Sequence, residues 1–211
     1  MLLIAFGSDA DLPGGADFDQ WLGSIFNHPI TEPNWYLIQE WDLNWAGDPN
    51  LFLAQSIRLF RDPEVLLDKY DAEQIEQGFR YLLFWAGGLE RWIWAKEIDS
   101  ALRTACVTSM VNVFDRLFSR NSFGEACFMW WDHLRESSSY SDPKIETAML
   151  EALSKILDIN SHECQISALH GLGHLKNPAK RELIDTFLAS HPALDEKTKQ
   201  YAEDAKHGRI L

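Results

Sequence analysis

His170 and His174 are the two residues whose type and spacing most directly suggest chemistry. Residues four apart lie on one face of an α-helix, so both imidazoles could reach the same metal ion. A catalytic zinc helix of the His-Glu-x-x-His type would have Glu at position 171, where this chain has Gly171. The sequence marks no third ligand unless His162 or Cys164, at the beginning of the same helix, comes close. We therefore expect no metal and no other cofactor, and expect two exposed or hydrogen-bonded histidines on a packing helix. If a metal does bind, His170 and His174 are the candidate ligands.

Covalent chemistry finds little support in the sequence. Cys106 or Cys127 would need a basic neighbour and partial exposure to act as a nucleophile, but both lie among apolar residues. Together with Cys164 they make an odd number of widely separated cysteines, which argues against a disulfide framework and fits the cytoplasm. The chain contains no G-x-S-x-G motif, no glycine-rich phosphate loop after a strand and no paired C-x-x-C. We therefore predict that the cysteines are core residues and that the protein is not an enzyme.

The charge of the chain excludes some classes of partner. There are 32 acidic and 19 basic side chains, for a formal net charge of −13. Non-specific binding to nucleic acid or to anionic lipid needs Lys and Arg, so neither is expected. Residues 1–60 hold eight carboxylates and a single basic residue, Arg58. Two interpretations stay open: a solvated, solubilising surface, or a surface that attracts a basic protein partner.

Aromatic side chains lie beside these carboxylates. Trp41 and Trp45 fall in an irregular segment, residues 27–47, together with acidic neighbours. An aromatic anchor surrounded by carboxylates fits a basic protein surface, because charge speeds the encounter and aromatic burial slows release. Trp130 and Trp131 are adjacent, so they cannot face the same way on a helix, and we expect one of them to reach a rim or groove. The predicted partner-binding residues are Asp17, Asp19, Glu40, Trp41, Asp42, Trp45 and Asp48.

The elements that must position these residues are predicted to be helices. Four dipeptides place a capping oxygen before a proline, which suits the first turn of a helix: Asp48-Pro49, Asp62-Pro63, Asp142-Pro143 and Asn177-Pro178. Asp71 is predicted to cap the next helix after residue 70, and Asp99 or Ser100 the long one that follows. Apolar residues at helical spacing then predict helices at 17–26, 35–41, 49–60, 63–70, 72–86, 90–96, 100–118, 123–135, 143–157, 161–175, 178–189 and 195–207. Residues 1–6 form an apolar run that is either a strand or a tucked-in terminus.

Two of these helices carry further expectations. Apolar residues cover most of the circumference of the helix at 100–118, which predicts a largely buried, central helix. Ser122 and Glu125 have the spacing of a capping box, which predicts the helix at 123–135.

The polar run at 137–142 is the best internal boundary, since all nine Trp residues lie at or before Trp131. We expect an acidic, Trp-rich helical part at 1–136 and helix pairs at 142–211, joined in one continuous domain.

The tail resembles a known class of repeat. The residues that carry the resemblance are Ala168, Leu169, Leu172, Gly173, Leu175, Asn177, Pro178, Leu183 and Leu188. They are similar to HEAT-like α-solenoid repeats over about residues 142–211, in which antiparallel helix pairs stack into a right-handed superhelix. The resemblance implies an all-α fold and a surface for protein recognition. Two helix pairs are fewer than the three units that a stack usually needs, so the aromatic N-terminal part should cover the open end.

These observations favour binding as the class of function. Small acidic proteins of this kind are similar to bacterial immunity proteins, which bind and block a toxin. We predict a non-catalytic protein that sequesters or inhibits a cationic protein partner, most concretely a toxin. The alternatives are a small helical metal-dependent hydrolase that uses His170 and His174, and a scaffold subunit of a larger assembly. The N-terminal apolar run is too short for a secretion signal, and no later run approaches the ~18 apolar residues of a membrane span, so a cytoplasmic location is expected. The oligomeric state is left open.

Overall fold

The fold is all-α, as predicted, in the residues that the computed structural model describes, which are 18–38, 48–83, 88–134 and 141–210. Within these ranges there are eleven α-helices and no strand. The first part of the chain contains α1 (Phe18–Phe26), α2 (Trp35–Ile38), α3 (Pro49–Arg61), the 3₁₀-helix η3 (Pro63–Leu66), α4 (Ala72–Leu83), α5 (Leu89–Trp94), α6 (Ser100–Asn112), the π-helical segment η4 (Val113–Phe118) and α7 (Gly124–Phe128). The tail contains α8 (Pro143–Leu157), α9 (His162–His174), α10 (Lys180–Ser190) and α11 (Glu196–Lys206). The apolar run at 1–6 lies outside the described residues.

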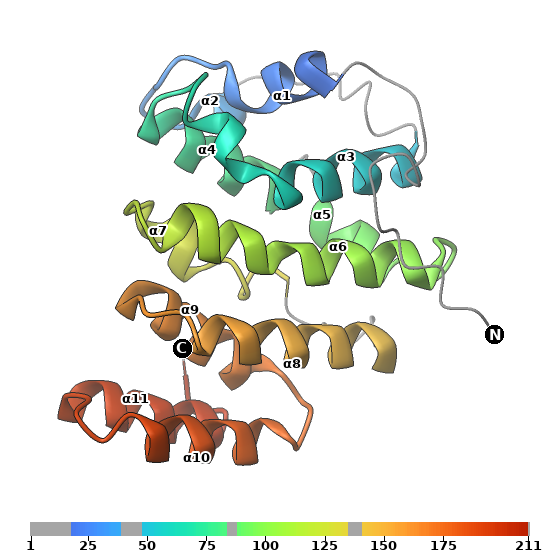
Figure 1. The fold of residues 1–211 in the computed structure, drawn as a ribbon. Coiled ribbons are helices and arrows are strands. Elements are labelled where there is room, and N and C mark those ends of the chain that lie inside the picture. The colour runs from blue at the N-terminus through green and yellow to red at the C-terminus, as the bar shows by residue number, and fades with distance from the viewer. Residues whose placement is uncertain (1–17, 39–47, 84–87, 135–140, 211) are drawn as a thin grey trace.

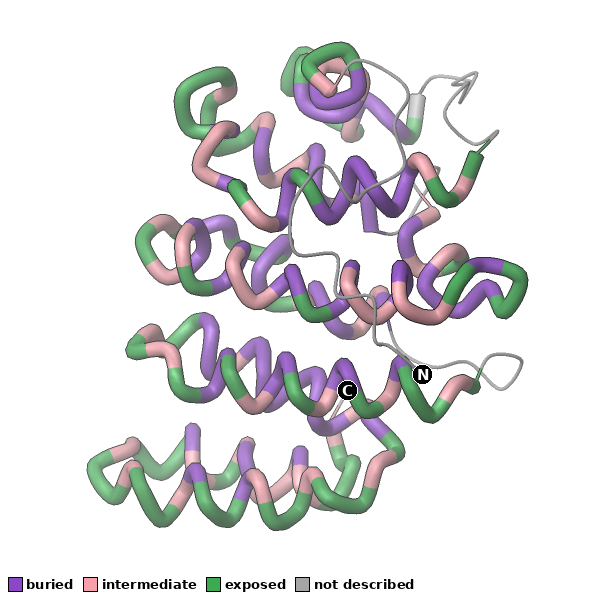
Figure 2. Tube along the Cα trace, turned by 45° about the vertical axis from the view of Figure 1, so that its right-hand side comes forward, coloured by how far each residue is buried: buried purple, intermediate pink, exposed green. Residues whose placement is uncertain are grey.

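The helices lie in successive layers along the long dimension of the molecule. Figure 1 shows α1 to α4 at one end, then α5 to α7, then α8 and α9, with α10 and α11 at the other end. The helix α6 contacts α3 on one side and α8 on the other, which confirms the central, buried helix expected at 100–118. Buried residues face neighbouring layers and exposed residues lie mainly on the outside and at the ends (Figure 2). Each layer therefore buries its apolar faces against the next.

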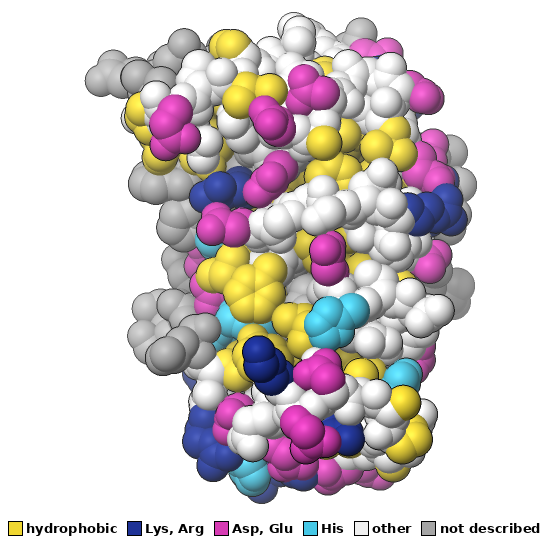
Figure 3. Space-filling view, turned by 90° about the vertical axis from the view of Figure 1, so that its left-hand side faces the viewer, with side chains coloured by type: hydrophobic (Ala, Val, Ile, Leu, Met, Phe, Trp, Pro, Cys, Tyr) yellow, Lys and Arg dark blue, Asp and Glu magenta, His cyan; other side chains and the backbone are white. Residues whose placement is uncertain are grey.

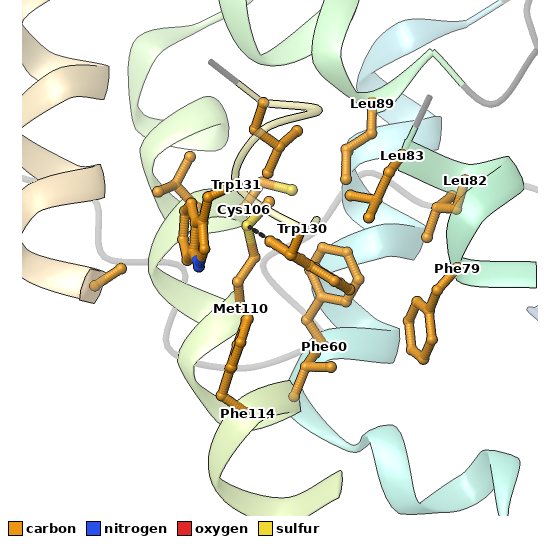
Figure 4. Packing of buried hydrophobic residues seen from close by; sticks show 14 of the residues in the cluster. Phe60, Phe79, Leu82, Leu83, Leu89, Cys106, Met110, Phe114, Trp130 and Trp131 are labelled. Carbon is orange, nitrogen blue, oxygen red and sulfur yellow. Dashed lines mark hydrogen bonds between the residues drawn. The ribbon is translucent and has the colours of Figure 1, made fainter. Parts of the chain in front are cut away.

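An aromatic cluster around Trp130 fills the interior of the first part (Figure 4). Trp130 is fully buried, and four phenylalanine rings surround it edge-on with centroids 5.4–5.7 Å away: Phe60, Phe79, Phe114 and Phe118. The indole Nε1 of Trp130 donates to Sδ of Met110 at 3.3 Å. Such edge-to-face pairs add to the free energy of burial, because the positive ring edge meets the negative ring face.

The prediction that Trp130 or Trp131 reaches the surface is wrong. Trp131 is also buried, and its indole stacks on the ring of Phe114, with ring centroids 6.0 Å apart. The two indoles do point in different directions, but both directions lead into the interior. Trp131 lies close to Gly171 of α9, so it packs at the contact between the first part and the tail.

Most predicted helix starts are confirmed by their caps. Five aspartate side chains accept backbone N–H groups of the following first turn: Asp48, Asp71, Asp99, Asp142 and Asp195. Two prolines behave differently. Asp62-Pro63 begins only the four-residue η3, and the carboxylate of Asp62 accepts from Arg116 at 2.7 Å instead of capping. After Asn177-Pro178, α10 begins at Lys180, because the side chain of Asn177 bonds to the N–H of Ala179 in a turn that precedes the helix.

The helix predicted at 123–135 is mostly absent. The helix α7 ends at Phe128, and turns follow to residue 134. The capping box does not form: the hydroxyl of Ser122 donates to the carboxylate of Glu163, and the carboxylate of Glu125 pairs with Arg80 at 3.1 Å. Gly124 has a φ of +47°, a left-handed conformation that interrupts the expected first turn. Ser122 and Glu125 therefore bond to residues of other layers instead of forming the local capping box.

A buried ion pair joins the first part to the tail. Arg103 of α6 is 3% exposed, and its Nη1 lies 2.9 Å from Oδ2 of Asp142, the residue that caps α8. The same guanidinium donates to the carbonyl oxygens of Ile98 and Ile93 at 3.1 and 3.2 Å. These bonds compensate the cost of removing the charge from water. None of the described helices has the length and apolar character needed to cross a membrane.

Candidate functional site

The predicted partner-binding residues fall into two groups. Asp17, Glu40, Trp41, Asp42 and Trp45 lie outside the described residues. Asp19 lies on α1, and Asp48 precedes α3. The positions of the seven predicted partner-binding residues relative to one another therefore cannot be compared, and this set stays a prediction.

Asp19 and Asp48 both have structural partners. One carboxylate oxygen of Asp48 accepts from the N–H groups of Asn50 and Leu51 at 2.9 and 3.3 Å, so this residue is a helix cap. Asp19 lies 2.5 Å from the ammonium of Lys69, whose hydrogen bond and charge lower the pKa of Asp19. The Asp19 side chain is exposed, and such surface pairs contribute little to stability. Asp19 thus remains on the surface, whereas the charge of Asp48 is committed to α3.

The first part also exposes apolar side chains that sequence reasoning missed. Ile30 is 47% exposed, Leu37 50% and Leu67 44%. Leu37 follows Trp35 and Tyr36 in the short α2, and both of these aromatic residues are buried. A four-residue helix gives no periodicity from which the exposed position could have been found. The acidic first part therefore offers apolar contact area as well as charge.

The second candidate site is a cluster of Asp132, His170 and His174. The helix α9 places the two histidines one turn apart, and their Nε2 atoms are 3.2 Å from each other. The Nε2 of His174 is also 3.1 Å from Oδ1 of Asp132, which lies in the turns after α7. One potential ligand atom from each residue falls within 4.8 Å of the other two. Three residues capable of binding a metal thus converge at one point.

The surroundings hold His170 rigidly. Its side chain is fully buried, and Nδ1 lies 2.6 Å from the hydroxyl of Tyr201 on α11, so of the two expected states, exposed or hydrogen-bonded, His170 has the second. The ring of Phe128 lies 4.7 Å from the imidazole. Burial raises the pKa of Tyr201 to about 12, so the phenol stays protonated at neutral pH. The side chains of His174 and Asp132 are 16% and 21% exposed, so the cluster has one side open to water.

No pattern in the sequence indicated Asp132 as a ligand. It lies 38 residues before His170, inside a segment predicted to be regular helix, and no spacing links the two. The third ligands that were considered are located elsewhere: His162 is exposed at the opposite end of α9, and Cys164 directs its thiol at the carbonyl of Phe114. Tyr201 lies 31 residues after His170 on another helix, so no spacing links these two residues either.

The cysteines are core residues, as predicted. Cys106, Cys127 and Cys164 are buried and carry free thiols. Burial raises the pKa of Cys106, and a hydrogen bond with Cys164 together with burial raises the pKa of Cys127. Raised values keep both groups in the thiol form, which is a poor nucleophile.

Comparison with protein-family models, with curated proteins and with solved structures finds no match to this chain.

Proposed function

We propose that this protein acts by stoichiometric binding to a cationic protein partner and has no catalytic role. The observation that carries the proposal is that negative charge and exposed apolar side chains occur together in the first part of the chain. The described residues 18–38 and 48–83 contain nine carboxylates and four Lys or Arg, whereas residues 141–210 contain eleven and nine. Figure 3 shows hydrophobic side chains among acidic ones in the upper layers, and acidic side chains interspersed with Lys and Arg in the lower layers.

These two properties perform different tasks in protein association. A net negative surface attracts a basic partner over about one Debye length and raises the association rate. Exposed apolar groups such as Leu37 and Leu67 add burial when the complex forms, which slows its dissociation. The most concrete form of the proposal is an immunity protein that occludes the active site of a cationic toxin.

We further infer that the layers form a HEAT-like right-handed α-solenoid of antiparallel helix pairs. The order of helix contacts supports this inference, since α6 contacts α8, α8 contacts α9, and α9 and α10 both contact α11. Each layer thus meets mainly its neighbours, as repeat units do. The continuous outer surface of such a stack suits recognition of another protein.

The test begins with the proteins encoded by the neighbouring genes, each co-expressed with this chain and tested for co-purification. For a partner found in this way, association rates are measured across a series of salt concentrations. The variant Asp17→Lys/Glu40→Lys/Asp42→Lys removes acidic charge from the first part. Asp48 is left unchanged because it caps α3, and Asp19 because it pairs with Lys69.

The matched control reverses three exposed carboxylates of the tail, Glu151→Lys/Asp158→Lys/Glu182→Lys, which changes net charge by the same amount. We expect the first variant to associate at least tenfold more slowly with a flatter salt dependence, and the control to change much less. Equal slowing in both variants would show that the association rate depends on the net charge of the protein and not on an acidic surface in its first part. Unchanged rates in both would contradict an acidic binding surface.

A further inference from the structure

We infer that Asp132, His170 and His174 form a binding site for a divalent transition-metal ion of the zinc class. The site joins the turns after α7 to the C-terminal half of α9. The inference is independent of the proposed partner binding, because none of its residues belongs to the predicted partner-binding set.

The spacing of the ligand atoms fits a tetrahedral ion. Zinc binds imidazole nitrogen and carboxylate oxygen at about 2.0–2.2 Å, so two ligand atoms on one tetrahedral ion are roughly 3.3 Å apart. Two separations are close to this value: 3.2 Å between the histidine Nε2 atoms and 3.1 Å between His174 Nε2 and Asp132 Oδ1. All three ligand atoms lie within 4.8 Å of one another, so an ion can bind when side-chain rotation closes the third pair by up to about 1.5 Å. Imidazole with carboxylate is a donor set suited to zinc and its neighbours in the first transition series.

Tyr201 orients the buried ligand. A metal-binding histidine usually donates the N–H of its other ring nitrogen to an outer acceptor, which fixes the tautomer and the ring plane. In His170 this second nitrogen is Nδ1, 2.6 Å from the hydroxyl oxygen of Tyr201. When Nδ1–H donates to that oxygen, the lone pair of Nε2 points toward His174 and Asp132. The structure thus includes all three ligands and a supporting partner for one of them.

The close contacts at Nε2 of His174 involve a single proton. A neutral or protonated His174 carries at most one proton on Nε2, and this proton lies near two acceptor atoms, Nε2 of His170 and Oδ1 of Asp132. The proton can align with only one of these two atoms. A cation placed among the three atoms would bind one lone pair from each of them at once.

The end of α9 also favours a cation. Carbonyl groups at a helix C-terminus carry partial negative charge, and His170 and His174 lie in the last turns of this helix. The partly exposed side chains of His174 and Asp132 provide a path of entry from water.

The experiment titrates metal-free protein with Zn²⁺ in competition with a chromogenic chelator and measures thermal unfolding in parallel. Binding of one ion per chain with submicromolar affinity is expected. At a hundredfold excess over the dissociation constant, the melting temperature should rise on the order of 5 °C. Cobalt should give the intense visible absorption of a four-coordinate ion.

The variants separate this site from adventitious binding. His174→Gln and Asp132→Asn should each weaken zinc binding at least a hundredfold, and Tyr201→Phe about 10–100-fold through loss of the outer hydrogen bond. His162→Gln, an exposed histidine on the same helix, should bind like the wild type. Because His174 and Asp132 are partly exposed, these variants should stay folded, which circular dichroism checks.

Two results would overturn the inference. One is a wild-type chain that binds no zinc at micromolar concentration and shows no thermal shift. The other is one-to-one binding that survives in His174→Gln and Asp132→Asn and is lost in His162→Gln, which would place the ion on the surface of α9.

Discussion

Arg103 is a charged side chain that the fold takes almost completely out of water. Its guanidinium bonds to two backbone carbonyls and to Asp142, so these three groups would lose a hydrogen-bond donor together if it were removed. A buried pair of this kind need not stabilise the fold relative to apolar residues of the same shape. Removing one partner is nevertheless costly, because the remaining charge and carbonyls lose their compensation.

We predict that Arg103→Met lowers the free energy of unfolding by about 3–5 kcal/mol. The measurement is urea denaturation followed by circular dichroism. Arg181→Met is the matched control, since Arg181 is exposed on α10 and should change stability by no more than about 0.5 kcal/mol. Similar small losses in both variants would show that Asp142 and the two carbonyls rehydrate without Arg103.

Asp142 should make stability depend on pH. Partial burial opposes ionisation, but the N–H of Lys144 and the guanidinium of Arg103 favour it, and the net effect is a lowered pKa. A carboxyl group whose pKa is lower in the folded state contributes stability above its unfolded pKa of about 3.9, and this contribution is lost as the pH falls through the folded value.

Asp142→Asn keeps a capping oxygen but removes the charge. We therefore expect it to be less stable than the wild type at pH 7, with the difference shrinking as the pH falls from about 5 toward 2. Stability is measured by denaturation at each pH. Asp158→Asn, at an exposed position beyond α8, should show a small difference. A pH-independent difference for Asp142→Asn would assign its effect to packing.

The cap of α3 separates a structural role of Asp48 from a binding role. Asn caps helices about as well as Asp, so Asp48→Asn should leave stability nearly unchanged, whereas Asp48→Ala should lower it by about 0.5–2 kcal/mol. Thermal and urea unfolding of the two variants give the comparison. If Asp48→Asn instead weakens partner binding with its stability intact, Asp48 contributes to recognition through its charge.

Close packing of α9 gives a sharper test at Gly171. A Cβ added there would lie 2.7 Å from Cβ of Trp131 and 2.8 Å from Cδ2 of Leu153. Gly171→Ala should therefore lower the free energy of unfolding by about 1–3 kcal/mol, although alanine is the better helix former. Gly23→Ala on α1, where nothing lies within 4 Å, should raise it by about 0.4–1 kcal/mol. Denaturation of both variants tests whether helix propensity or packing determines the change in the free energy of unfolding.

Helix starts could be predicted because their signals are local. An aspartate before a proline needs only the next three residues to act as a cap, which is why α3 and α8 begin where expected. The Ser122 and Glu125 pattern predicted a helix wrongly, because both side chains found partners on other helices. A single sequence does not show which distant residue competes for a local hydrogen bond.

The same limit applies to the candidate sites. Spacing on one helix identified His170 and His174, but Asp132 and Tyr201 reach them only through the packing of three separate segments. The exposed Leu37 likewise depends on which side of a short helix the buried Trp35 and Tyr36 occupy. Composition showed the acidic character of the first part without showing which of its carboxylates already have structural roles.

Unfolding of the whole molecule should be one cooperative event. The ion pair between Arg103 and Asp142 and the contact of Trp131 with Gly171 both connect the first part to the tail. All nine Trp residues lie at or before Trp131, so Trp fluorescence reports on the first part, whereas circular dichroism reports on all helices. We predict coincident urea transitions by the two probes. Separated midpoints would show that the tail unfolds independently.

The proposed partner-binding surface and the proposed zinc site lie in different layers of the molecule. The acidic and apolar surface belongs to the layers of α1 to α4, and the histidine cluster lies between the turns after α7 and α9. Zinc binding should therefore leave the rate of association with a partner unchanged, apart from any effect of added stability. Measuring that rate with and without zinc checks whether the sites are independent.

The π-helical segment η4 has a consequence for how the length of this chain can change. A π-helical turn accommodates more residues than an α-helical one, so it is equivalent to an inserted residue in a continuous helix. Deleting one residue between 113 and 118 would let the helix run on as regular α, and because the wider turn had absorbed that residue, the residues on either side would keep nearly the same facing about the helix axis. The change would be local, at the spacing of Phe114 and Phe118, which both pack against Trp130. A deletion inside the regular α6 would instead turn everything after it by about 100°. Relatives of this chain that are one residue shorter should thus lose that residue inside η4 or in the loops between layers, and not inside α6.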